Sequence, residues 1–93
     1  MLTPINQIAA VIATAFFDIR AADTASKEYW IEAAQPYLDI MLDLDTLEGF
    51  WGIDPRADIV VKFLEASNDW AGALATHVKR QLRQHLKEAN ANH

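Results

Sequence analysis

The first apolar pattern of the chain runs over residues 4–21 with the spacing of an α-helix. Ile5, Ile8 and Ile12 recur every three or four positions, and alanines between them widen the apolar face. Thr3 followed by Pro4 predicts an N-cap with proline at the first helical position. We therefore expect a helix over 4–21 that is the central and most buried element of the fold.

A second helix is predicted to begin within 22–26, where Asp, Thr and Ser offer three N-cap residues. Its apolar periodicity reaches residue 35. Pro36 then either kinks this helix or opens a new one that continues to residue 47, because proline removes a backbone donor and clashes with the preceding turn.

Two more helices complete the pattern. Asp54-Pro55 repeats the cap-and-proline signal and predicts a helix over 55–66. After a short polar turn, amphipathic spacing predicts a last helix over 70–89, which leaves 90–93 as a frayed tail.

Strand signals are weak throughout, because the chain has no sustained alternation of apolar and polar residues and no hairpin dipeptide. Its length of 93 residues fits one domain. We therefore predict an all-α fold: a small single domain over 1–89, built as a bundle of four to five helices around a buried N-terminal helix.

Charge changes this picture because it is segregated along the chain. The net charge is −5, but residues 1–69 carry 12 acids against 4 bases, whereas residues 70–93 carry 4 bases against a single acid. Such asymmetry favours a role for electrostatics in docking or in self-association.

The second predicted helix gathers its acids on one side. At about 100° per residue they fall within an arc of roughly 80°, and the rest of the turn, Tyr29 and Tyr37 included, is largely apolar. We expect this helix to be mostly buried, with one carboxylate stripe outside. The stripe comprises Glu28, Glu32, Asp39 and Asp43. It is a solvated face, a docking surface for a basic partner, or an internal partner of the last helix.

The last predicted helix has the opposite charge. Its cations occupy an arc of roughly 100° and comprise Lys79, Arg80, Arg83 and Lys87. They suit an ordinary amphipathic helix with cations near its C-terminus, a contact with nucleic-acid phosphates, or pairing with an acidic stripe in the same or a second copy. Direct nucleic-acid binding is disfavoured, because the first turn of this helix lacks base-reading side chains and the acidic body repels phosphates.

Two adjacent aromatic residues, Phe50 and Trp51, lie between Gly49 and Gly52. They either fold back onto the core or anchor a partner, since aromatic side chains dominate the energetics of interfaces.

Signatures of catalysis are missing from the sequence. There is no cysteine, no histidine pair at i,i+4 and no Glu-x-x-His. Ser26 and Ser67 lie where caps are expected, and His85 falls on the apolar arc of the last helix as a core-edge histidine. We expect no enzymatic activity, no cofactor and no metal.

Membrane and export signals are weak as well. The most apolar stretch, 8–17, is shorter than the roughly 20 residues of a bilayer span, and no basic residue precedes it. The expected location is therefore the cytoplasm, without membrane association.

These observations favour a non-enzymatic acidic module that occludes a basic, nucleic-acid-binding surface of a partner protein. Small phage-encoded inhibitors, such as anti-CRISPR and anti-restriction proteins, are similar in size and charge, and no motif assigns the chain to a family. The expected partner-binding residues are the acidic stripe with Phe50 and Trp51. The alternatives are a small DNA-binding regulator that uses the basic last helix and a self-assembling structural or adaptor subunit, with a homodimer as the simplest assembly.

Overall fold

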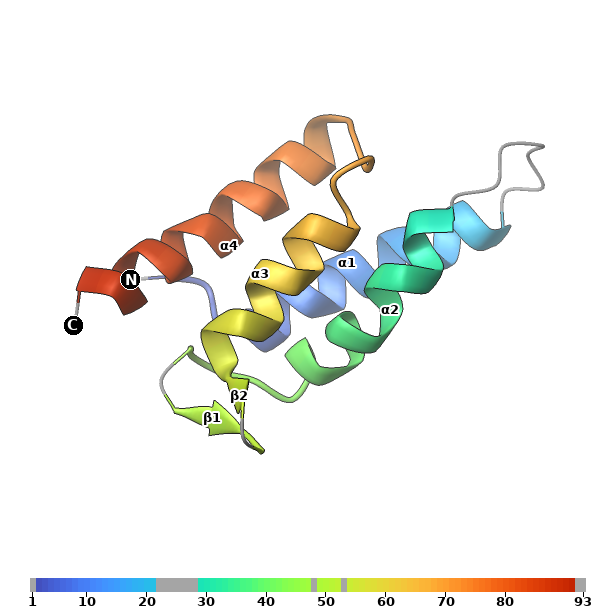
Figure 1. Cartoon of the computed structure of the whole chain (residues 1–93). Helices are drawn as coiled ribbons and strands as arrows, with labels where there is room; N and C mark the ends of the chain where they lie inside the picture. The colour runs from blue at the N-terminus through green and yellow to red at the C-terminus, as the bar shows by residue number, and fades with distance from the viewer. Residues whose placement is uncertain (1, 22–28, 48, 53, 92–93) are drawn as a thin grey trace.

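Successive helices of the chain run in alternating directions and pack into one bundle (Figure 1). The structure is a computed structural model that describes residues 2–21, 29–47, 49–52 and 54–91, without the side chains at positions 50, 51, 54, 90 and 91. Its elements are α1 (Ile5–Ala21), α2 (Tyr29–Met41), β1 (Phe50–Trp51), β2 (Asp54–Pro55), α3 (Arg56–Ala66) and α4 (Ala73–Ala91). The predicted all-α fold is confirmed.

The four described helices form a ring in which each packs against two others. α1 and α3 both contact α2 and α4, and the interface between α2 and α3 is the most extensive. α1 turns five side chains into the core, among them Ile8, Ile12 and Phe16, as its apolar spacing predicts. Its outer face nevertheless exposes Val11 and Phe17, because the bundle covers only one side of the helix.

Both predicted cap-and-proline signals are displaced by one residue. The Pro4 carbonyl accepts the first hydrogen bonds of α1, from the amides of Gln7 and Ile8, and Pro55 has the extended backbone of an N-cap residue (φ −58°, ψ 140°) before α3. Proline therefore precedes the first helical residue in both places. Thr3 is not the N-cap residue of α1. Its hydroxyl and carbonyl oxygens instead accept hydrogen bonds from Gln81 and His85 of α4.

α2 passes through Pro36 without a break and ends at Met41, six residues before the predicted end. Proline is exposed there, while Ala34 and Leu38 on the opposite side are buried against the bundle. Packing on both sides of Pro36 in sequence holds the helix together despite the missing amide. Beyond Met41 the chain turns, so Asp43 lies outside the helix.

The predicted loop between α2 and α3 contains a small hairpin that the sequence did not reveal. β1 and β2 pair antiparallel, with Phe50 opposite Pro55 and Trp51 opposite Asp54. Gly52 turns the chain between them with φ +64°, a conformation that tight hairpin turns require and that glycine adopts without strain.

The start of α4 also differs from the prediction, which placed it at residue 70. Gly72 has φ +115°, which a right-handed helix excludes, and its carbonyl accepts the amide of Thr76. Trp70 therefore lies in the connection from α3, where it is buried. At its other end the helix extends to Ala91, two residues into the predicted tail.

Aromatic rings fill the end of the bundle where α1 finishes and α4 begins. Phe16 meets Trp30 and Trp70 edge-on, with ring centroids 5.3 and 5.5 Å apart. It also stacks on Phe63 at 6.1 Å, and the two tryptophans stack at 5.9 Å. Such pairs are favourable beyond the area they bury. We call these four residues the aromatic end.

Hydrogen bonds between distant segments dominate the opposite end. His85 donates from Nε2 to the carbonyl of Thr3 at 2.6 Å, because a carbonyl can only accept. The amide of Ile5 donates to the carbonyl of Asp45, whose carboxylate is 3.3 Å from the Arg56 guanidinium. We call this set the polar end.

Candidate interaction surface

The outer side of α2 and the turn after it carry exposed carboxylates. Glu32 and Asp39 lie on the solvent side of α2, and Asp43 follows in the turn, with all three side chains exposed. We call these three the acidic face. Glu28, the fourth predicted member, lies outside the described residues. Glu32 and Asp39 share one side of α2 because the helix continues through Pro36.

No base of the same chain neutralises this acidic face within the described residues. Asp39 accepts a hydrogen bond of 2.8 Å from the amide of Gln35, which is neutral. The ion pair that the described residues do contain joins Asp45 to Arg56 at the polar end. Pairing of the stripe with the last helix, one of the three alternatives above, is thus not observed.

A shallow groove of about 480 Å³ lies beside the acidic face, between α2 and α3. Its lining comprises Ala33, Tyr37, Lys62, Glu65 and Ala66. Tyr29, at the start of α2, is 77% exposed. The helical wheel assigned Tyr29 and Tyr37 to the buried side, so the sequence missed this apolar margin. These tyrosines can be distinguished from core residues only when the position of α3 against α2 is known.

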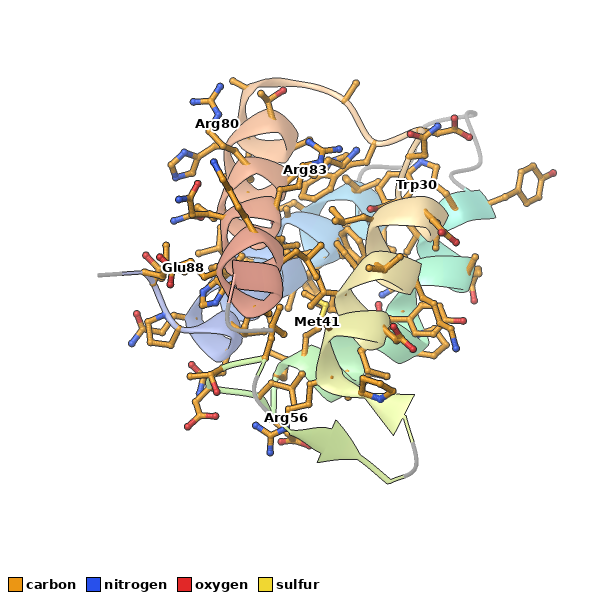
Figure 2. The ribbon with its side chains drawn as sticks, turned by 60° about the vertical axis from the view of Figure 1, so that its left-hand side comes forward. Trp30, Met41, Arg56, Arg80, Arg83 and Glu88 are labelled. Atoms are coloured by element: carbon orange, nitrogen blue, oxygen red, sulfur yellow. The ribbon has the colours of Figure 1, made fainter. Side chains whose placement is uncertain are left out.

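The predicted basic residues of α4 do not act as one group. Arg80, Arg83 and Lys87 are exposed, and Arg83 lies nearer to α3 than Arg80 does (Figure 2). Lys79 differs from the prediction. It is 8% exposed and donates from Nζ to the carbonyls of Ser67 and Trp70, at 2.8 and 2.6 Å.

Lys79 therefore closes the connection between α3 and α4. Its ammonium also lies 6.0 Å from the centre of the Trp70 ring, within range of a cation–π contact. Burial lowers the pKa of Lys79, and the nearby charge of Arg83 adds to that effect while Asp69 opposes it. The sequence could not distinguish this lysine from its neighbours, because the carbonyls it caps belong to the connection between α3 and α4.

The backbone of Phe50 and Trp51 forms β1, next to the start of α3. Their side chains lie outside the described part of the structure, so both readings of this pair remain predictions. Arg56 anchors the base of the hairpin, since its amide donates to the carbonyl of Gly49, and Figure 2 places its side chain beside the two strands.

The remaining sequence predictions concern metals, membranes and relatives. Within residues 2–21, 29–47, 49–52 and 54–91, no three His, Asp or Glu side chains gather as a metal site would need. None of the described helices has both the length and the apolar character that crossing a bilayer requires. Comparison with protein-family models, with curated proteins and with solved structures found no match to this chain.

Proposed function

We propose that this chain is a non-enzymatic protein-binding module whose acidic face docks on a basic surface of a partner protein. The observation that carries the proposal is that Glu32, Asp39 and Asp43 are all exposed and that none is neutralised by a base among the described residues. Exposed carboxylates without an ionic partner complement lysine and arginine side chains, steer association and fix the orientation of the complex.

The mechanism we propose is occlusion. A partner that binds nucleic acid contacts phosphates through lysine and arginine, and the acidic face would occupy those groups. The groove between α2 and α3 lies next to the acidic face. It offers an apolar contact through Ala33, Tyr37 and Ala66, beside the charged Lys62 and Glu65 that also line it. Such a complex needs an apolar contact because exposed charge pairs alone contribute little affinity. An inhibitor of the phage-encoded kind is one protein that would work in this way.

The test compares two variants of equal charge. E32Q/D39N/D43N neutralises the acidic face, and D18N/D69N/E88Q neutralises three exposed acids on other elements. Each raises the net charge from −5 to −2. We expect the first to weaken partner capture from a host lysate roughly tenfold, because it removes three interfacial pairs. The second should leave capture close to that of the wild type.

Salt and folding provide the controls for this comparison. The difference between the two variants should shrink as salt screens the pairs, and circular dichroism should show both to be as helical as the wild type. Equal capture by both variants at low salt would overturn the proposal, because net charge or another surface, rather than the acidic face, would then govern binding.

The two alternative functions are tested separately. Of the four cations predicted to support DNA binding through α4, Lys79 instead bonds to backbone carbonyls of the same chain. The first turn of α4 begins with Ala73 and Leu74, which cannot read bases through hydrogen bonds. A gel shift with duplex DNA at low salt tests it, and retention that R80Q/R83Q/K87Q abolishes would favour it. Sizing chromatography at high protein concentration tests self-assembly.

A further inference from the structure

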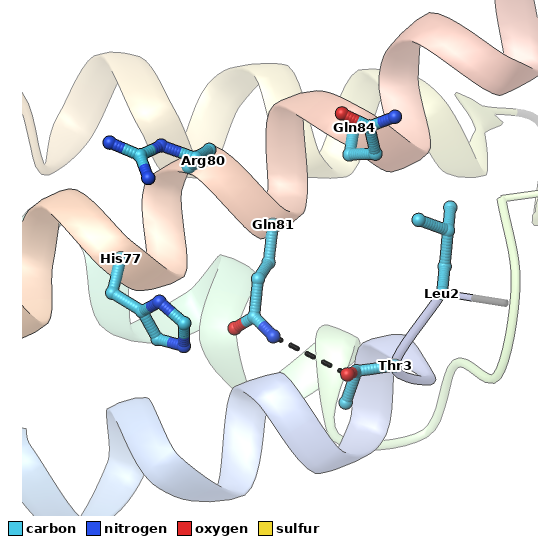
Figure 3. A pocket seen from close by; sticks show the side chains of 6 residues that line it. All are labelled: Leu2, Thr3, His77, Arg80, Gln81 and Gln84. Atoms are coloured by element: carbon cyan, nitrogen blue, oxygen red, sulfur yellow. Dashed lines mark hydrogen bonds between the residues drawn. The ribbon is translucent and has the colours of Figure 1, made fainter.

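A second surface feature lies far from the acidic face, where α4 passes over the N-terminal segment. It is a hollow of about 290 Å³. Figure 3 shows the six residues that line it: Leu2, Thr3, His77, Arg80, Gln81 and Gln84. Four of them are spaced three or four residues apart on α4, so they share one side of that helix.

The lower wall of the hollow is held in place from α4. Gln81 donates from Nε2 to the hydroxyl oxygen of Thr3 at 3.3 Å (Figure 3). One turn later, buried His85 holds the carbonyl of the same threonine. Two side chains of α4 thus fix the position of Thr3, and the hollow exists before any ligand arrives.

The lining is rich in donors and contains no carboxylate. Arg80 supplies a guanidinium with five N–H donors, and Gln84 and His77 add an amide and an imidazole. None of these three side chains has a hydrogen-bond or ion-pair partner among the described residues. Glu88, the acid of α4, lies one turn beyond Gln84 and does not line the hollow.

We propose that this hollow binds a small oxyanion, a carboxylate or phosphate group, with Arg80 as its charged partner. Guanidinium groups bind both classes through paired hydrogen bonds. His77 lies one turn before Arg80, on the side toward which the Arg80 side chain extends (Figure 3), and donates to a remaining oxygen. Gln84 and Leu2 lie at the other end of the hollow, where they accommodate a substituent of the ligand. The proposal does not depend on the acidic face, because no residue is shared between them.

The test is a heteronuclear NMR titration of the full chain with sodium phosphate and, separately, with sodium acetate, at constant ionic strength set with chloride. We expect saturable shifts at the amides of Thr3 and of residues 77–84, with a dissociation constant of roughly 1–10 mM. Tighter binding of phosphate would assign the site to phosphate groups, and binding of acetate at least as tight would assign it to carboxylates.

Two variants of equal charge decide whether the hollow is responsible. R80Q should weaken binding roughly tenfold, since the charged hydrogen bonds are lost. R83Q, which removes a charge one turn along α4, from a residue that does not line the hollow, should bind as the wild type does. T3V removes the hydroxyl that accepts the hydrogen bond from Gln81. It should weaken binding without unfolding the chain, as monitored by circular dichroism. Equal effects of R80Q and R83Q, or shifts that chloride alone reproduces, would overturn the proposal.

Discussion

The two ends of the bundle are held together in different ways. At the aromatic end, Phe16, Trp30, Phe63 and Trp70 contact one another through ring faces and edges. At the polar end, segments far apart in the sequence are joined by single hydrogen bonds and one ion pair. The comparison teaches that side-chain volume sets the stability of one end, while the pairing of individual polar groups sets that of the other.

The largest effect is expected from Phe16→Ala, which removes the ring that touches three others. The substitution should lower the free energy of unfolding by about 3–5 kcal/mol, because it deletes a buried aromatic and leaves a cavity. Chain neighbour Phe17, which is 70% exposed against 1% for Phe16, provides the matched control, and Phe17→Ala should change stability by less than about 0.5 kcal/mol. Urea denaturation measures both. Similar losses in the two variants would contradict the assignment of the aromatic end.

Lys79→Met sharpens the comparison by removing the polar group that caps the aromatic end. Met keeps much of the buried stem, but the carbonyl of Trp70 loses its hydrogen bond from the ammonium. We expect a loss of about 2 kcal/mol, the cost of leaving a buried acceptor unpaired. Arg83→Met, an exposed position on the same helix, should cost less than about 0.5 kcal/mol. A neutral Lys79→Met would show that ring packing alone holds this end.

His85→Leu tests the polar end directly. Leucine preserves the volume of the side chain, and the carbonyl of Thr3 loses its donor. We expect the free energy of unfolding to fall by about 1 kcal/mol, with faster hydrogen exchange at the first turn of α1. Gln84→Leu, an exposed neighbour, controls for added apolar surface. If hydrogen exchange in α1 were unchanged, the Thr3 contact would not be holding that helix start.

The smallest effect concerns the pH dependence of Asp45. Hydrogen bonds from the amide of Thr46 and from its own amide lower the pKa of this carboxyl, and Arg56 adds to the effect. The folded pKa lies below the unfolded one, so the ionised form stabilises the fold at neutral pH, and this contribution is lost as the pH falls below about 4. Asp45→Asn should therefore be slightly less stable than the wild type at neutral pH.

The difference between Asp45→Asn and the wild type should vanish in acid, where both side chains are neutral. Urea denaturation midpoints across a pH series measure it. A gap that stays constant with pH would mean that the side-chain hydrogen bonds, rather than the charge, matter at this position.

The two ends also differ in how well the sequence predicts them. Apolar spacing predicts part of the aromatic end, since Phe16 and Phe63 lie on the predicted inner faces of their helices. Trp70 was predicted inside the last helix and lies in the connection before it. The polar end does not follow from the sequence, because Thr3, Asp45 and His85 are ordinary polar residues until the fold brings their segments together. Helix boundaries at Pro4, Met41 and Gly72 shifted for a related reason, since packing and one positive φ decided them.

The candidate surfaces divide in the same way. The exposure of Glu32 and Asp39 follows from the helical wheel, which places them opposite the apolar arc. Asp43 is exposed in the turn after α2, which the wheel does not describe. The internal role of Lys79 and the groove between α2 and α3 depend on which helices become neighbours. A single sequence carries no periodic signal for that choice.

The contact between Thr3 and His85 has a consequence for the order of folding. It joins residues 82 positions apart, so nearly the whole chain must be available before it can form, and long loops are closed late because their closure costs entropy. The contact between α2 and α3, which are connected by a short hairpin, can form earlier because its loop is short. During synthesis on a ribosome, Thr3 would lack its hydrogen bonds from Gln81 and His85 until α4 has been made. The hollow between Thr3 and α4 would then be the last part of the surface to form.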